Sequence, residues 1–216
     1  MPELSDGEIT NFLVILLCVI VLLIYKKTKS YASARGVVLF IVFAILAFIK
    51  FKTVVNPTLL GFRLDNFEAT IFPTILFVVL GTAFLYSMRI KTQKFKVVKW
   101  LMSLASLYLV FGIAQQTFFQ SIFTHSLNTL LGNQVLAVLL SGIFFASFHL
   151  KKGTRGIRFG IMALLGGFVM SYLFLSSPNI ILLGVSHAFL ASGYYFWVND
   201  ENNLERRLKL EHARTS

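Results

Sequence analysis

Long apolar runs, separated by short clusters of lysine and arginine, constrain the fold of this 216-residue chain more than any other feature. The runs approach the roughly 17–25 residues that an α-helix needs to cross the hydrocarbon core of a bilayer. A chain in lipid must pair its own backbone polar groups, and a helix does so within one segment. With 56% hydrophobic and 13% charged residues, the composition excludes an ordinary soluble domain. The sequence therefore predicts an all-α integral membrane protein with about seven transmembrane helices in one bundle.

The predicted spans follow directly from the apolar runs. They lie at about 12–25, 36–51, 71–88, 100–123, 157–174 and 180–197, and a further span follows a turn rich in Asn and Gly (Asn128, Gly132 and Asn133) and ends near His149. The longest polar interval, 52–70, has turn signals at Asn56-Pro57 and at Gly61, and we expect it to hold a short interfacial or re-entrant piece. The tail after residue 197 is expected to form a short surface helix.

The basic residues predict the orientation of the spans. A net charge of +11 would ordinarily raise nucleic acid as a partner, but the cations lie in short clusters between apolar runs. Eight polar segments flank the seven predicted spans. Counted from the N-terminus, the odd-numbered segments carry 0, 3, 0 and 0 Lys or Arg, and the even-numbered segments carry 4, 5, 4 and 4. The positive-inside rule then predicts a plasma (inner) membrane protein with its N-terminus outside and its C-terminus in the cytoplasm. Membrane lipid is the expected partner of the basic loops, and no nucleic acid is expected.

Polar side chains interrupt the apolar runs at three places. A cluster of Gln115, Gln116 and Gln120 lies in the fourth span, His149 ends the fifth, and His187 lies inside the seventh. An amide or imidazole that faced lipid would be costly, so such residues usually face a protein interior and mark a site. We expect these five side chains to form one pocket.

The three segments resemble, in order and spacing, the motifs of the CPBP intramembrane proteases. That family includes the CAAX prenyl proteases and bacteriocin-processing and self-immunity proteins, and its motifs are Glu-Glu-x-x-x-Arg, Phe-x-x-x-His and His-x-x-x-Asn/Asp. The motif positions that match are Phe145, His149 and His187; Gln115 and Gln116 stand at the two Glu positions, Gln120 at the Arg position and Ala191 at the Asn position. The resemblance covers about residues 100–197 and divides the chain into N-terminal spans (1–99), a CPBP-like core (100–197) and a cytoplasmic tail (198–216).

The resemblance implies a helical bundle in which a glutamate and the span-five histidine activate water for peptide hydrolysis. The span-seven His and Asn would stabilise the oxyanion. A neutral amide can position a water but cannot hold its proton, so Gln115 and Gln116 cannot replace the general base. Of the nine acidic residues, none lies inside a span, and only Asp65 and Glu68 lie where they could reach inward. We therefore expect an impaired enzyme that binds a hydrophobic peptide, a transmembrane helix or a lipid-linked partner in the inherited cavity.

Other interpretations stay open. In an active, divergent endopeptidase, His149 would act as base on a water positioned by Gln115, and His187 would hold the oxyanion. The glutamines could instead join helices by hydrogen bonds, and His149 could be an interfacial histidine. A small transporter is disfavoured because no span contains a carboxylate. No cofactor is expected, and two histidines are too few ligands for a metal site. We expect His125 and His212 to be solvated.

Overall fold

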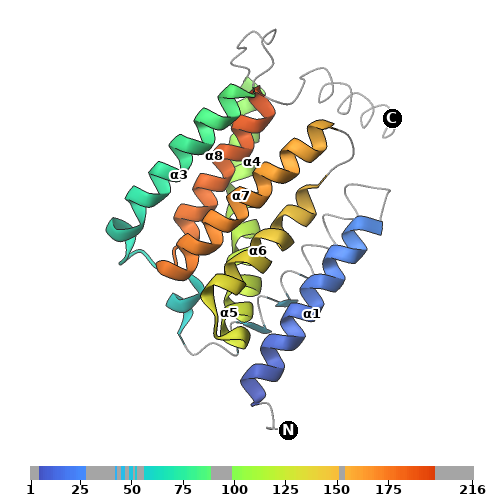
Figure 1. Ribbon diagram of the computed structural model, residues 1–216. Coiled ribbons are helices and arrows are strands. Elements are labelled where there is room, and N and C mark those ends of the chain that lie inside the picture. The colour runs from blue at the N-terminus through green and yellow to red at the C-terminus, as the bar shows by residue number, and fades with distance from the viewer. Residues whose placement is uncertain are drawn as a thin grey trace.

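The computed structural model describes residues 5–27, the isolated positions 42, 45, 46, 49, 50 and 52, and the ranges 56–88, 99–150 and 154–197. Every regular element in these parts of the chain is helical (Figure 1). The prediction of an all-α protein is confirmed for them. Most of the predicted second span, the basic segment 89–98 and the tail 198–216 lie outside the described residues.

The described helices follow the predicted order. They are α1 (Asp6–Lys27), the 3₁₀ turn η1 (Pro57–Leu60), α3 (Phe67–Ser87), α4 (Lys99–Gln116), the π-helix η2 (Thr117–Thr124), α5 (His125–Leu131), α6 (Gln134–His149), α7 (Thr154–Ser176) and α8 (Ile180–Trp197). Within the described residues, three helices are long and apolar enough to cross a membrane, in α1, α3 and α7, while α6 and α8 are apolar but shorter. An integral membrane protein is thus supported, and the count of seven spans stays a prediction.

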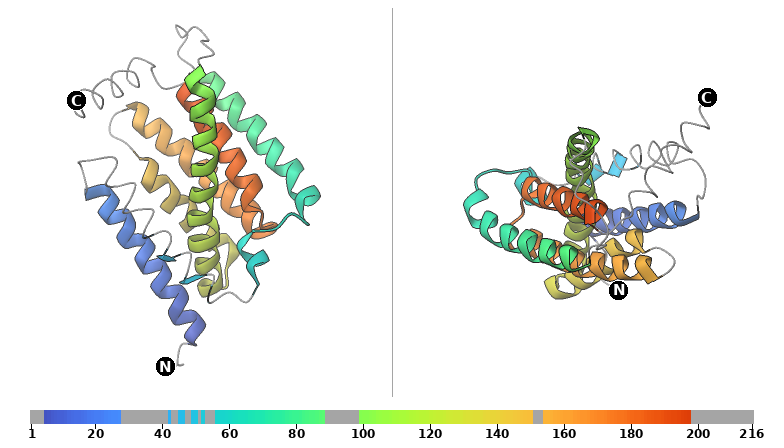
Figure 2. Two further views of the ribbon diagram at one scale, coloured as in Figure 1. Left: turned by 180° about the vertical axis from the view of Figure 1, so that it is seen from behind. Right: turned by 90° about the horizontal axis from the view of Figure 1, so that it is seen from above.

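Glycines set how closely two pairs of helices approach. A Cβ at Gly112 of α4 would lie only 2.5 Å from the backbone oxygen of Gly184 in α8. A Cβ at Gly167 of α7 would lie 3.0 Å from Cα of Gly142 in α6. Small residues permit this backbone contact between membrane helices. As a result α8 packs between α4 and α3, and α6 packs on α7 (Figures 1 and 2).

The hairpin between α5 and α6 has the turn chemistry that the sequence indicated. Gly132 takes the left-handed conformation at φ 59°, which favours glycine. The side chain of Asn133 then accepts a hydrogen bond from the backbone N–H of Leu136 (3.0 Å) and caps α6. Since α6 begins at Gln134, its length carries His149 to the far end of the helix.

The described part of the interval 52–70 is a clamp rather than a loose loop. Gly61, at φ 82°, accepts a hydrogen bond from the backbone N–H of Ile180 (2.9 Å). The Asn66 amide donates to Pro178 O (2.9 Å) and accepts from the Asn179 amide (2.9 Å). These bonds tie the start of α3 to the turn between α7 and α8. The clamp therefore fixes the position of α3 relative to α8.

One cation that the charge count placed in a loop is buried. Lys50 is 2% exposed, and its Nζ donates to Oδ1 of Asn11 on α1 (2.6 Å). A buried ammonium needs such a partner because leaving water is costly. Lys50 thus contributes to helix packing rather than to a solvated basic loop.

Candidate functional site

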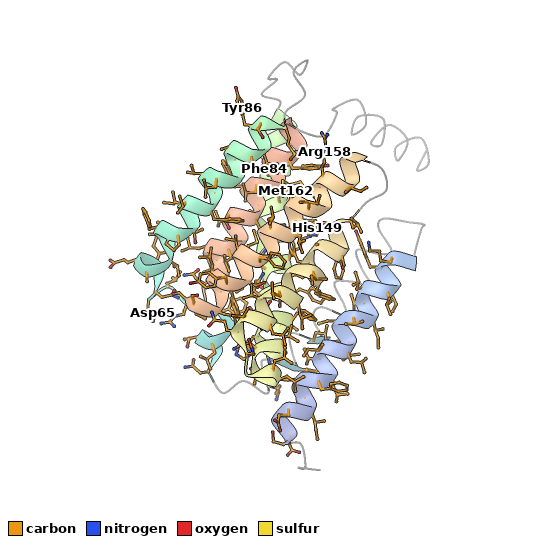
Figure 3. The ribbon with its side chains drawn as sticks, in the orientation of Figure 1. Asp65, Phe84, Tyr86, His149, Arg158 and Met162 are labelled. Atoms are coloured by element: carbon orange, nitrogen blue, oxygen red, sulfur yellow. The ribbon has the colours of Figure 1, made fainter. Side chains whose placement is uncertain are left out.

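A cavity of about 560 Å³ lies between α3, α7 and α8 and reaches the end of α6. Its walls come from positions 73–85 of α3, 159–173 of α7 and 187–194 of α8. This volume is within the range of small-molecule sites, about 300–1,000 Å³. The described lining residues include no Asp, Glu, Lys or Arg. Figure 3 shows Phe84 of α3, Met162 of α7 and His149 of α6 near the same end of the bundle. The cavity is therefore a mainly apolar space with very few groups that can exchange protons.

Two of those groups are histidines, and Phe145 packs against both. The ring of Phe145 stacks on His149 with centroids 4.4 Å apart and meets His187 edge-on at 5.7 Å. The centroids of the two imidazoles are 6.3 Å apart. His187 is only 9% exposed, yet it lines the cavity together with Phe145, His149 and Ala191. The structure thus brings the second and third motifs together on one cavity.

A hydrogen bond sets the tautomer of His149. Its Nδ1 lies 2.8 Å from the backbone oxygen of Phe145, one helical turn earlier. A carbonyl oxygen can only accept, so Nδ1 carries the proton and donates it. In the neutral ring the lone pair is then on Nε2. His149 can accept a hydrogen bond or a proton only through that atom.

The glutamines of the first motif do not line this cavity. Gln116 is fully buried, and its Nε2 contacts Sδ of Met170 at 3.1 Å, while Met170 itself lines the cavity. Gln120 is 1% exposed and accepts a hydrogen bond from the Thr124 hydroxyl (3.0 Å). Gln115 is partly buried and is not among the lining residues. The amides therefore lie outside the cavity wall, and their predicted catalytic or binding roles stay predictions.

The amide cluster is also incompletely paired. In the described part of the chain, Oε1 of Gln116 and Nε2 of Gln120 are buried without a hydrogen-bond partner. Unpaired buried polar atoms are rare because each costs free energy. The hydrogen bonds that these glutamines could make between helices are thus present only in part. Those present join Gln116 to α7 and Gln120 to its own helical segment.

A π-helix begins directly after Gln116. All eight residues of η2 are buried, and the Thr124 hydroxyl donates to Phe119 O, five residues back, at 2.8 Å. The aromatic side chains of this segment pack on α6. The ring centroids of Phe119 and Phe145 are 4.7 Å apart, and the stacked rings of Phe123 and Phe144 have centroids 3.9 Å apart. A π-helix has a wider turn than an α-helix and is frequent at functional sites. Here it presses Phe119 against Phe145, whose carbonyl and ring hold His149.

Sequence reasoning missed the residues that form most of the cavity wall. The wall from α3 belongs to a span that carried no motif, and Phe159, Met162, Met170 and Tyr194 read as ordinary apolar residues. Among the glycines of α7, a Cβ at Gly167 would meet the backbone of Gly142 in α6, whereas a Cβ at Gly166 would meet only Phe77 Cζ, at 3.9 Å. His125 is half-buried with its Nδ1 enclosed, so the expectation that it is solvated was wrong. His212 lies outside the described residues.

Comparison with known proteins matches the family model described as type II CAAX prenyl endopeptidase Rce1-like to residues 96–192. That range contains all seven motif positions, including both cavity histidines. The matched segment, 96–192, is similar to the CPBP proteases, and the predicted resemblance is confirmed over that segment. No curated protein and no solved structure matches this chain.

Proposed function

We propose that this CPBP-family protein binds a lipid-linked or otherwise apolar membrane peptide in the cavity and does not hydrolyse it. One observation carries the proposal. The described lining residues offer His149 and His187 in apolar surroundings, and no carboxylate is among these described residues. The inherited space supports binding, while the general base of the family is replaced by amides that stand outside the cavity wall.

Hydrolysis would need three functions on one substrate bond: a base for water, a position for that water, and donors for the oxyanion. His149 can offer a lone pair at Nε2, but Gln115 does not reach the cavity lining. At the family's Asn position, Ala191 presents a methyl group that cannot donate. His187 would then be left to stabilise the oxyanion by itself. The alternative of an active endopeptidase is therefore disfavoured.

In a membrane, the hydrophobic effect does not drive an apolar group into this cavity as it would from water. Lipid tails are as apolar as the cavity wall, so burial alone gives little preference for the protein over the bilayer. Selectivity must come from close packing and from hydrogen bonds in a medium of low polarity, where they are strong. The two histidines are suited to hold a peptide carbonyl or amide at one end of an apolar chain.

A cavity-filling variant tests the binding. Gly166 lines the cavity, and its nearest neighbour for a Cβ is 3.9 Å away, so Gly166→Leu should fill the space without moving the helices. Ile161→Phe is the matched control, because Ile161 lies on the same helix, is 53% exposed and does not line the cavity. We expect Gly166→Leu to abolish co-purification of the membrane partner and Ile161→Phe to leave it unchanged. Equal recovery from both variants would contradict a role for this cavity.

A second experiment tests hydrolysis. Purified protein in nanodiscs would be incubated with prenylated and unmodified membrane-proximal peptides, and the products analysed by mass spectrometry. We expect no cleavage by the natural sequence. The triple variant Gln115→Glu, Gln116→Glu and Gln120→Arg should also be inactive, because these side chains lie outside the cavity lining. A product that disappears in His149→Ala would instead establish the endopeptidase.

We also propose that the protein lies in the plasma membrane with its N-terminus outside and its tail in the cytoplasm, as the distribution of basic residues supports. Single cysteines at Ser5 and in the tail would be labelled with a membrane-impermeant maleimide in intact cells. Cys18 is buried and should not react, so it need not be removed. Labelling of the tail but not of residue 5 would reverse the orientation.

A further inference from the structure

We propose that the cavity, together with a second pocket at the clamped end of α3, also binds a single-chain amphiphile whose uncharged, hydroxyl-bearing head lies in that second pocket. The proposal rests on the proposed function, because the apolar chain occupies the same cavity. It adds the chemistry of the head and the direction in which the ligand lies.

The second pocket has a volume of about 250 Å³ and lies between the first turns of α3 and the turn between α7 and α8. It shares Pro73, Tyr172 and Leu173 with the larger cavity, so the two spaces adjoin. Together they extend from position 69 to position 85 of α3, about 24 Å at a rise of about 1.5 Å per residue. The hydrocarbon core is about 30 Å thick, so the combined groove runs across most of it. Figure 1 shows α3 and α7 on either side of α8 along this length.

The polarity of the groove changes along its length. The larger cavity is mainly apolar, whereas the second pocket is lined by Thr70, Thr74, Ser176, Ser177 and Asn179 together with apolar residues. Thr70 and Thr74 are 5% and 7% exposed, so these hydroxyls belong to an enclosed wall and not to a solvated surface. A ligand that is polar at one end and apolar along the rest has the same pattern.

The hydrogen bonds of this wall leave both donors and acceptors for a ligand. The Thr70 hydroxyl donates to Asn66 O (2.9 Å), which leaves its lone pairs able to accept. Ser177 Oγ accepts from the Asn66 amide (3.0 Å), which leaves its own hydrogen able to donate. The Asn179 side chain already forms hydrogen bonds within the protein, since its amide donates to Asn66 and its oxygen accepts from the backbone N–H of Leu182. A hydroxyl group on the ligand can both accept and donate here, as this wall requires.

The electrostatics favour a neutral head over a phosphate. No Asp, Glu, Lys or Arg is among the described residues that line the second pocket. On the neighbouring loop, Arg63 forms two hydrogen bonds with Asp65, and neither residue lines the pocket. A phosphate placed in this enclosed wall would lose water without gaining a cation, which is costly. Glycerol and sugar hydroxyls carry no such penalty.

The test uses the full chain in nanodiscs and three probes that carry a diazirine on the same sixteen-carbon chain: monopalmitoylglycerol, palmitoyl lysophosphatidylglycerol and hexadecane. We expect crosslinks from monopalmitoylglycerol to residues of the larger cavity at a lower concentration than for either other probe. Thr74→Val is nearly isosteric and should weaken the binding of monopalmitoylglycerol by about fivefold, because one hydrogen bond is lost. It should leave the binding of hexadecane unchanged. Thr82→Val is the matched control, because Thr82 lies on the same helix and lines neither space.

The outcomes separate this proposal from the proposed function. Gly166→Leu tests the cavity, and Thr74→Val and a second variant, Ser177→Ala, test the head. If Gly166→Leu loses all crosslinks while the other two variants have no effect, the assignment of the head is overturned and the binding cavity remains. Equal or stronger crosslinking by the lysophospholipid would also overturn it. If Gly166→Leu changes no probe, the cavity does not bind the amphiphile and this proposal fails. The proposed function fails separately, if Gly166→Leu leaves co-purification of the membrane partner unchanged.

Discussion

Replacing Gly112 by alanine tests how the closest helix contact positions the site. The new Cβ would lie 2.5 Å from Gly184 O and 3.1 Å from Ala188 Cβ, where ordinary contact begins at 3.4 Å. The backbone of α8 must therefore withdraw by roughly 1 Å, and such overpacking costs about 1–3 kcal/mol. Alanine recovers about 1 kcal/mol of helix propensity, which leaves a net destabilisation of about 0–2 kcal/mol. His187 lies between Gly184 and Ala188, so the shift also moves it relative to His149.

Gly166→Ala is the matched control, since its Cβ would have 3.9 Å to its nearest neighbour and no backbone has to move. This variant should gain about 0.5–1 kcal/mol from helix propensity alone. The assay is the unfolding midpoint of each purified variant in mixed micelles, with partner binding measured in parallel. We expect Gly112→Ala to be less stable than Gly166→Ala by about 1–3 kcal/mol, and to bind the partner more weakly. Equal stability of the two variants would refute the packing argument.

Three further predictions concern the buried amides, the π-helix and the clamp loop. Gln116→Leu should change the free energy of unfolding by less than about 1 kcal/mol, because it removes an unpaired buried oxygen together with a weak bond to sulfur; a loss of several kcal/mol in chemical denaturation would show that the amide has a stronger partner. Thr124→Val should destabilise by about 1–3 kcal/mol, since it removes the hydroxyl donor and leaves Gln120 Oε1 buried without it; an unchanged melting temperature would contradict this. The hydrogen bond from Arg63 lowers the pKa of Asp65. The stabilisation of the folded protein by this pair is therefore fully present above the unfolded pKa of about 3.9, and it is lost as pH falls through the lower folded pKa. Asp65→Asn should therefore flatten the stability profile below about pH 4, and identical acid profiles for the two proteins would exclude the effect.

Much of the architecture could be predicted because its causes are local in sequence. Apolar runs and the Gly132–Asn133 turn predicted the positions of α6, α7 and α8, and α8 begins and ends where the apolar run does. The order and spacing of Phe145, His149 and His187 predicted the resemblance, and the family model matches the segment that contains them. Such features depend on the periodicity and chemistry of neighbouring residues, so one sequence contains them.

The contents of the cavity wall could not be predicted in the same way. Residues of α3 and α7 become lining only through the crossing of helices far apart in the chain, and nothing in their own segments distinguishes Met170 or Leu80 from other apolar residues. The π-helix was equally hidden, and its aromatic side chains pack on α6, which is a contact between separate segments.

The sequence alone determined the helical class and the resemblance of residues 96–192 to the family. It also determined that amides, and not carboxylates, stand at positions 115 and 116, and no arrangement of helices can change that residue type. Only the tertiary structure decided which of these residues share a space. Phe145, His149 and His187 meet on the cavity because α6 and α8 bring them there, whereas the Gln116 amide contacts Met170 of α7 and does not line the cavity. The physical reason is that residue type sets what a group can do, while side-chain packing sets what it can reach.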